Sequence, residues 1–200
     1  MSPPVPPLLL LATLGLCVAF IVVYVARQES ARRCKQEKQP PLTDVLHSPT
    51  FDKLHTVAHV VCVLTQVTAF LAYIWMLSST GDALGTELTG AVSVTAVLLL
   101  ARSAMFLATT LPDASGTCTG SAAPWTTHGG CGDLMFSGHT AIITAAFLRA
   151  GVGGGWACFG GALYGIGACI LRRHYTIDVI VGIGAAFAAQ ALVGGVTHLG

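Results

Sequence analysis

The sequence predicts an all-α protein that crosses a membrane with six helices. Of its 200 residues, 54% are hydrophobic and only 10% are charged, and the mean hydropathy is +0.73. A water-soluble domain needs more polar surface than this composition supplies. A spanning helix needs about 20 mostly apolar residues. Six stretches approach this length, at approximately 5–26, 56–77, 88–110, 134–150, 153–171 and 177–198.

The first apolar stretch is interpreted as an anchor helix. The opening MSPPVPP contains no basic residue, and the apolar run continues through Val25 to a basic stop at Arg27. A cleaved signal peptide normally begins with a basic segment, which is missing here. We therefore expect an N-terminal anchor at 1–27, a polar loop at 28–55 and a five-helix core at 56–200.

Two long polar connections and one short turn fall on the same face of the membrane if the spans alternate in direction. The first connection carries prolines at 40, 41 and 49, and the second, 112–130, is rich in Gly, Ser, Thr and Pro. The fourth and fifth stretches are separated only by 151–155, which predicts a tight helical hairpin. With the turn at 172–175, this face holds every residue with candidate chemistry.

Composition also limits the partners. A formal net charge of +1 argues against nucleic acid. The cysteines form no CxxC pair, and His55 and His59 have no third ligand nearby, so no metal or cofactor is expected and His47, His55 and His59 are interpreted as interfacial. Cys118 and Cys131 share one polar connection, and whether they form a disulfide is left open. The glycine-rich words lack a following GK[ST] and favour close helix packing over a nucleotide loop.

Ionisable side chains at membrane depth are expensive, so each is a candidate for function. His174 and Asp178 are four residues apart at the entry of the last stretch, which places them on one helix face. A carboxylate there can orient the imidazole and make its other nitrogen more basic. The alternative is an interfacial pair without catalytic use, and the spacing alone does not decide between the two.

His139 lies in the word CGDLMFSGHT, where Ser137 and Gly138 can begin the fourth helix. The free amides of a helix N-terminus attract phosphate. A histidine at that place can protonate a departing alkoxide, while Arg102 or Arg173 holds the phosphate oxygens. SGH alone is a weak signal, and its pairing with HxxxD one hairpin later strengthens it.

These residues carry a resemblance to a known family. SGHT followed by HYTID resembles the superfamily of the type 2 phosphatidic acid phosphatases. Longer words, in the same order and spacing, resemble the motifs of sphingomyelin synthases and their relatives. They are PPLTD, ARSAMFLATTLP, CGDLMFSGHT and HYTIDVIV.

The resemblance implies a two-step transfer without a metal or cofactor. His174, oriented by Asp178, would attack the phosphate of a glycerophospholipid, form a phosphohistidine and release diacylglycerol. His139 would protonate that leaving group and then act as base on ceramide, or on diacylglycerol as acceptor. The expected contacts to the phosphate and head group are Arg102, Asp133, Ser137, Gly138, Tyr175 and Arg173.

The chain also departs from the family pattern. Animal sphingomyelin synthases carry an acidic residue before HY, whereas this chain has Arg172 and Arg173. That leaves the head group open between choline, ethanolamine and inositol. The basic pair is more similar to plant-type inositol phosphorylceramide synthases, and the VGIG after HYTIDV to phosphatidylcholine:diacylglycerol cholinephosphotransferases. The arginines could equally anchor the membrane edge.

Location and alternatives stay open at this point. The resemblance implies the Golgi or plasma membrane, or the endoplasmic reticulum, with the active face toward the lumen or cell exterior. The basic residues at 27–53 argue for the cytosol instead. A lipid phosphate phosphatase is the second reading, although its KxxxxxxRP word is absent. A non-catalytic membrane protein is the third, and the oligomeric state is undecided.

Overall fold

The computed structural model describes residues 7–37, 42–108 and 136–197. In these ranges all regular structure is helical, which confirms the all-α prediction. Three short 3-10 helices occur, η1 (Val45–His47), η2 (Pro49–Leu54) and η3 (Gly81–Ala83). The α-helices are α1 (Pro7–Glu37), α2 (His55–Ser79), α3 (Leu84–Ala108), α4 (Gly138–Arg149), α5 (Gly154–Ile170) and α6 (Thr176–Thr197).

The first helix is longer than its apolar run predicts. The anchor was expected to end at residue 27, yet α1 continues to Glu37. Its polar continuation is supported by Glu29, whose carboxylate accepts hydrogen bonds from Arg32 at 2.8 Å and Arg33 at 2.9 Å. Opposite charges three and four residues apart stabilise a helix. The segment predicted as loop 28–55 is therefore helical over its first part.

Four of the six α-helices are long and apolar enough to cross a membrane by length and composition, namely α1, α2, α3 and α6. This supports an integral membrane protein. The remaining two have 12 residues in α4 and 17 in α5. At 1.5 Å per residue they extend about 18 Å and about 26 Å, short of a hydrocarbon core of about 30 Å. Both short helices carry many buried residues, because the longer helices surround them.

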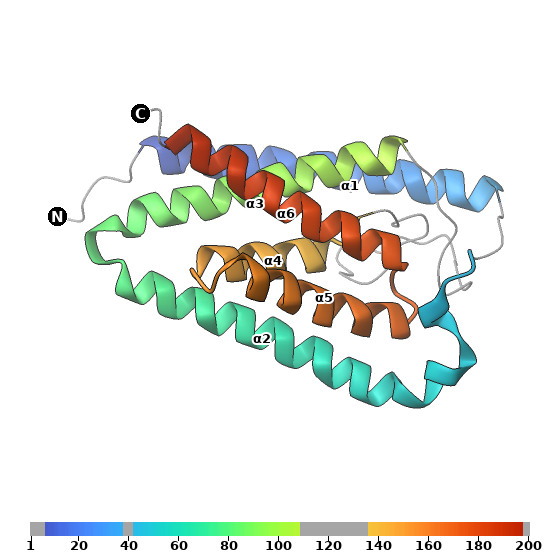
Figure 1. The fold of residues 1–200 in the computed structure, drawn as a ribbon. Helices are drawn as coiled ribbons and strands as arrows, with labels where there is room; N and C mark the ends of the chain where they lie inside the picture. Colours follow the sequence, from blue (N-terminus) through green and yellow to red (C-terminus); the bar gives the residue numbers. More distant parts are fainter. Residues whose placement is uncertain (1–6, 38–41, 109–135, 198–200) are drawn as a thin grey trace.

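The helices alternate in direction, as Figure 1 shows. The ends of α1, α3 and α5 therefore meet the beginnings of α2, α4 and α6 at one end of the bundle, which we call the site end. The connections 80–83 and 150–153 lie at the opposite end. This arrangement agrees with the expectation that the candidate residues share one face.

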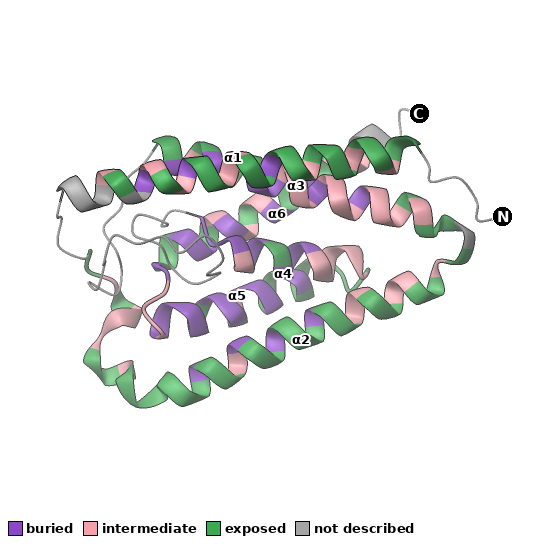
Figure 2. Ribbon diagram, turned by 180° about the vertical axis from the view of Figure 1, so that it is seen from behind, coloured by how far each residue is buried: buried purple, intermediate pink, exposed green. Residues whose placement is uncertain are grey.

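Burial is concentrated around the short helices. Figure 2 shows that buried residues gather on α4, on α5 and on the part of α6 near the site end, whereas α1 and α2 expose most of their surface. The exposed side chains of α1 are largely apolar, such as Leu10 and Ile21. An apolar exposed surface is what a helix facing lipid requires. The polar groups Thr140, Thr144 and Asp178 are instead fully buried among the helices.

Glycines on α5 allow its neighbours to approach closely. A Cβ atom built on Gly161 would lie 2.1 Å from Thr144 Oγ1, and one built on Gly165 would lie 2.2 Å from Val179 Cγ1. A side chain at either position would displace α4 or α6. Membrane helices associate through such small residues, since lipid offers no hydrophobic drive between them. The contacts are those that the sequence analysis expected from the glycine-rich words.

Candidate active site

A tight turn between α5 and α6 places the first candidate residue. The Arg172 N–H donates to the Cys169 carbonyl at 2.8 Å, and the Arg173 N–H donates to the Ala168 carbonyl at 2.9 Å. These two bonds form the Schellman pattern that ends many helices. The pattern requires a left-handed residue, and Arg172 supplies it with a φ of 54°. The chain then turns back toward the bundle with His174 directly before α6.

His174 and Asp178 form a buried pair at the start of α6. The Asp178 side chain is fully buried, and its Oδ2 lies 3.3 Å from His174 Nδ1. The same oxygen accepts a hydrogen bond from the Tyr175 N–H at 2.8 Å, which fixes the carboxylate relative to the backbone. Asp178 can therefore hold a proton on His174 Nδ1. His174 Nε2, which has no hydrogen-bond partner among the described residues, is left as the reactive nitrogen.

The N-terminus of α4 forms the second part of the site. Ser137 caps this helix, because its Oγ accepts a hydrogen bond from the Thr140 N–H at 3.4 Å and also bonds to Thr140 Oγ1 at 2.8 Å. The next residue is Gly138, and a Cβ built on it would lie 2.6 Å from Arg102 Nη1. The guanidinium of Arg102 thus occupies the space that a side chain would take. Amides and a cation meet here, as an anionic phosphate requires.

The Arg102 guanidinium is also held from the side by an aromatic ring. Its central carbon lies 4.9 Å from the centroid of the Phe106 ring, a cation–π distance. Phe106 is itself almost completely buried. This contact directs Arg102 from α3 toward the first turn of α4.

His139 stands in that first turn and is half-buried. Its ring stacks on Tyr164 of α5, with centroids 6.0 Å apart and planes inclined by 25°. Tyr164 also interacts electrostatically with Arg173. Besides these neighbours, His139 lines a cavity between α2, α3 and α4. It is therefore more accessible than His174.

The two helix N-termini are joined to one another. The Ser137 N–H donates to the Asp178 carbonyl at 3.0 Å, so the cap of α4 is bonded to the first turn of α6. A Cβ built on Gly182 would lie only 2.8 Å from the Ser137 carbonyl oxygen, which shows how closely the backbones pass. The structure thereby brings together the beginning of α4, with His139, and the beginning of α6, with Asp178.

A segment far away in the sequence contacts the turn that carries His174. Asp44 accepts hydrogen bonds from the Thr176 N–H at 2.7 Å and from Thr176 Oγ1 at 3.0 Å. His47 Nε2 lies 3.0 Å from the carbonyl oxygen of His174, to which it can donate. We call residues 42–52 the clamp. Sequence reasoning assigned His47 no specific contact and gave Asp44 no role, although Asp44 ends the word PPLTD.

The clamp also explains where Tyr175 points. Its side chain is buried, its hydroxyl accepts a hydrogen bond from the Leu42 N–H at 2.9 Å, and its ring lies 5.1 Å from that of His47. These contacts connect Tyr175 to the clamp, and its contact to substrate stays a prediction. Arg172 Nη2 lies 3.0 Å from Asp52 Oδ1 and makes a further, exposed connection.

Asp44 remains ionised through its hydrogen bonds. Burial alone raises the pKa of this carboxyl group, but the bonds from Thr176 and Leu46, together with the nearby His47, outweigh burial and lower the pKa below its ordinary value. Hydrogen bonds to a carboxylate favour its charged form. The clamp therefore binds the turn through the charged carboxylate of Asp44, which accepts stronger hydrogen bonds than a neutral group would.

Some predicted positions lie outside the described residues. Asp133, expected to contact the head group, is one of them. Cys118 and Cys131, for which a disulfide was left undecided, are the others. Among the described residues, no group of three or more His, Cys, Asp or Glu side chains could hold a metal ion.

The comparison with protein families covers the part of the chain that holds both histidines. Residues 130–192 match the family model described as PAP2 superfamily C-terminal. No curated protein and no solved structure matched the chain significantly. The PAP2 match supports a relation to the type 2 phosphatidic acid phosphatases, and with it an enzyme that hydrolyses or transfers phosphoryl groups.

The PAP2 segment, residues 130–192, carries His139, His174 and Asp178. Two contributors to the same site lie outside it, Arg102 on α3 and Asp44 in the clamp. The geometry accordingly extends the site beyond the matched segment.

Proposed function

We propose that the protein is a membrane lipid phosphotransferase that moves a phospho-head group from a glycerophospholipid to ceramide through a phosphohistidine on His174. The observation that carries this proposal is the buried His174–Asp178 pair, with Nδ1 and Oδ2 3.3 Å apart, joined by one backbone hydrogen bond, from the Ser137 N–H to the Asp178 carbonyl, to the cap of α4. A histidine held in one tautomer by a carboxylate is an activated nucleophile.

In the first step, His174 Nε2 attacks the phosphorus of the donor lipid. A nitrogen–phosphorus bond forms, and the bond from phosphorus to the diacylglycerol oxygen breaks. His139, in its protonated form, gives its proton to that oxygen, so diacylglycerol leaves as a neutral alcohol. The amides at the beginning of α4 and the Arg102 guanidinium hold the non-bridging oxygens, on which negative charge is concentrated.

In the second step, the neutral His139 accepts the proton of the ceramide hydroxyl. The hydroxyl oxygen attacks phosphorus, and the bond to His174 Nε2 breaks. The product is a phosphosphingolipid, and both histidines return to their starting states. Asp178 stabilises the positive charge that His174 carries while it is bonded to phosphorus, because the carboxylate is buried and close.

Burial favours a lipid acceptor over water. Asp178 is 0% and His174 9% exposed, and the surrounding helices are apolar. Hydrolysis is the second candidate function, and the PAP2 match favours it. In that reaction water takes the place of ceramide, with the same phosphohistidine and the same roles for both histidines.

The test is a transfer assay on the purified protein in liposomes. Fluorescent ceramide is offered with phosphatidylcholine, phosphatidylethanolamine or phosphatidylinositol in turn, and His174→Ala is measured beside the wild type. We expect a new phosphosphingolipid with one of the donors, and a loss of more than about 10³-fold in the variant, because the nucleophile is missing.

Each other result points to a different reaction. In a parallel reaction with head-group-labelled phosphatidylcholine and added diacylglycerol, label that moves to diacylglycerol, with none on ceramide, would assign a cholinephosphotransferase type of reaction. In another, with phosphatidic acid as the donor, release of inorganic phosphate that depends on His174 would assign the phosphatase. Undiminished transfer by His174→Ala would overturn the proposal.

A further inference from the structure

A cavity of about 330 Å³ opens between α2, α3 and α4. It lies within the size range of small-molecule sites, about 300 to 1,000 Å³. Most of its wall is apolar, with side chains spaced three and four residues apart on each helix. The lining residues are Gln66, Ala69, Phe70, Tyr73, Ala91, Val94, Thr95, Leu98, His139, Ile142, Ile143, Ala145, Ala146 and Arg149.

The two ends of the cavity differ in chemistry. His139 marks the end near the candidate active site, and Arg149 marks the other. The Arg149 guanidinium pairs with the Glu87 carboxylate and also donates to the Glu87 carbonyl at 3.2 Å. Only 10% of the Arg149 side chain is exposed. The Glu87 side chain is 32% exposed. The pair thus places a partly buried guanidinium and a carboxylate at this end, and an apolar group that entered between them would leave both charges unpaired.

The cavity is as long as one leaflet of a bilayer is deep. His139 and Arg149 are separated by ten residues of α4, which corresponds to about 15 Å at the helical rise of 1.5 Å per residue. Half of a hydrocarbon core of about 30 Å is the same length. The shape therefore fits a hydrocarbon chain that starts at the reacting phosphate and runs along α4.

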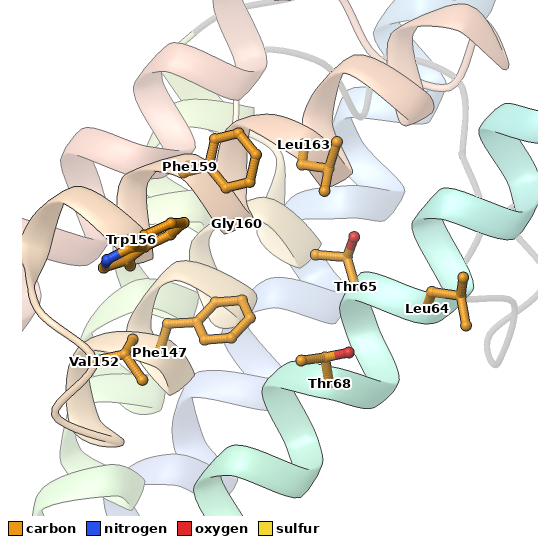
Figure 3. Close-up of a pocket in the computed structure, with 9 residues that line it drawn as sticks. All are labelled: Leu64, Thr65, Thr68, Phe147, Val152, Trp156, Phe159, Gly160 and Leu163. Carbon is orange, nitrogen blue, oxygen red and sulfur yellow. The ribbon is translucent and has the colours of Figure 1, made fainter.

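A second apolar hollow has neither a histidine of the candidate site nor a charged group in its lining. It has a volume of about 510 Å³ and is lined by residues of α2, α4 and α5 and of the loop before α5. Figure 3 shows its labelled side chains, among them Trp156 and Phe159, which are 70% and 57% exposed. Nothing about it fixes an orientation for a lipid, so the inference concerns the first cavity only.

We propose that the cavity between α2, α3 and α4 binds one hydrocarbon chain of the glycerophospholipid donor, and that the Arg149–Glu87 pair stops the chain and sets the preferred chain length. The identity of the lipid rests on the proposed function. The cavity adds a length selection that the catalytic residues do not provide. Long chains must bend or remain partly outside, whereas chains that end before Arg149 are buried completely.

The first test is a substitution that makes the cavity narrower. Ala91 lies on its wall and is half-buried, so Ala91→Leu adds bulk inside it. Filling an occupied apolar space costs about 1 to 3 kcal/mol, which corresponds to a loss of about 5- to 150-fold. We expect this loss of kcat/KM for long-chain phosphatidylcholine, with short-chain phosphatidylcholine much less affected. Ala188→Leu makes the same change on the exposed face of α6 and is the control.

A second variant acts on the end wall. Arg149→Ala combined with Glu87→Ala removes both charges together, so that neither is left unpaired, and the preference is expected to move toward longer chains. Ala91→Val is the smaller substitution if Ala91→Leu does not fold. Two folded variants with the wild-type chain-length profile would overturn the proposal.

A binding readout separates this inference from the proposed function. Thermal stabilisation by phosphatidylcholines of increasing chain length reports binding without turnover, and it is measured in His174→Ala. Stabilisation that depends on chain length and shifts in the Ala91→Leu background supports the cavity even if no transfer occurs. If turnover requires His174 but its chain-length dependence is the same in Ala91→Leu as in the wild type, the proposed function is supported and the proposed role of the cavity is overturned.

Discussion

One histidine lies in the first turn of α4 and another two residues before α6, and the two are held very differently. His174 is buried, pairs with Asp178, and has its own carbonyl bonded by His47. His139 is half-buried, stacks on Tyr164 and also borders a cavity. The imidazole of His174 is thus buried beside a carboxylate, whereas that of His139 lies at the wall of a cavity.

This difference agrees with different tasks. A nucleophile must keep one tautomer and one direction of attack, which explains the number of contacts around His174. A residue that serves first as acid and then as base must reach two different alcohol oxygens in turn. A position on the wall of a cavity is compatible with this task.

Next to the loss already expected for His174→Ala, the largest effect is expected from His139→Ala, through loss of proton transfer. General acid–base catalysis contributes about 10²- to 10⁴-fold, so transfer from natural phosphatidylcholine should fall by that factor. A donor with an acidic leaving group, such as p-nitrophenylphosphocholine, does not need to be protonated as it departs. The variant should therefore form the phosphohistidine from this donor at close to the wild-type rate. The measurement is the acid-labile label that accumulates on the protein.

The comparison with His174→Ala makes this prediction specific. The His174 variant should form no phosphohistidine from either donor, because the attacking nitrogen is absent. Equal losses with both donors in His139→Ala would show that His139 has no role as an acid in the first step.

The next largest effect is expected from Asp178→Asn, which should lower kcat by about 10²-fold or more and leave KM little changed. The amide retains the size of the carboxylate, but it cannot stabilise a charged His174 and can favour the wrong tautomer. Because Asp178 is fully buried, solvent does not replace the lost charge. The rate of phosphohistidine formation in a single turnover is the measurement.

The control for this variant is Asp52→Asn, the same chemical change at a half-exposed side chain. Its rate should stay within about twofold of the wild type, as for exposed ion pairs worth about 0 to 1 kcal/mol. If both variants behave alike, the pairing of Asp178 with His174 is not what activates the nucleophile.

A smaller effect is expected from Asp44→Asn, which weakens the clamp. Hydrogen bonds to a charged acceptor contribute about 1.5 to 3 kcal/mol, and the loss should lower both the melting temperature and kcat, the latter by about fivefold or more. The pKa of Asp44 is lower in the folded protein than its ordinary value. Its contribution is therefore complete above the ordinary carboxyl pKa of about 3.9 and is lost as the pH falls through the lower, folded value.

The pH dependence distinguishes the clamp from a general loss of packing. Below about pH 4, the difference in melting temperature between wild type and Asp44→Asn should shrink. A constant difference across the pH range would mean that the charge of Asp44 does not contribute. Leu42→Ala, which keeps the backbone N–H bonded to Tyr175, is the matched variant in the clamp and should leave the pH profile unchanged.

The sequence predicted the parts of this structure that have a local signal. Apolar runs gave α2 to α6 within a few residues, because each run needs burial or lipid around it. The sequence predicted that His174 and Asp178 contact one another, and they do. The expected reason, a shared helix face, was wrong, because α6 begins at Thr176 and His174 precedes it. The sequence also placed Ser137 at the cap of α4.

Contacts between distant segments gave no such signal. Asp44 and Thr176 are 132 residues apart. No periodic pattern in the sequence relates the polar loop that holds Asp44 to the turn that it contacts. His47 was interpreted as interfacial for the same reason. Asp133 and the Cys118–Cys131 bridge stay predictions, since they lie outside the described residues.

Arg172 shows a third kind of limit, and it leads to the prediction with the smallest expected effect. The sequence left its role open between head-group selection and membrane anchoring, yet it occupies the left-handed position that favours glycine, with φ 54°. Arg172→Gly removes an exposed pair with Asp52, worth about 0 to 1 kcal/mol. It also relieves a backbone conformation that costs a non-glycine residue about 1 to 2 kcal/mol.

The relief of strain is larger than the loss of the pair, so the unfolding free energy of Arg172→Gly should exceed that of the wild type by about 1 kcal/mol. Arg172→Ala loses the same pair but keeps the strain, and should be less stable than the glycine variant by about 1 kcal/mol. Thermal unfolding in detergent measures both. If the ratio of phosphatidylcholine to phosphatidylinositol used as donor changes equally in both variants, the guanidinium selects the head group. An unchanged ratio leaves Arg172 a structural part of the turn that presents His174.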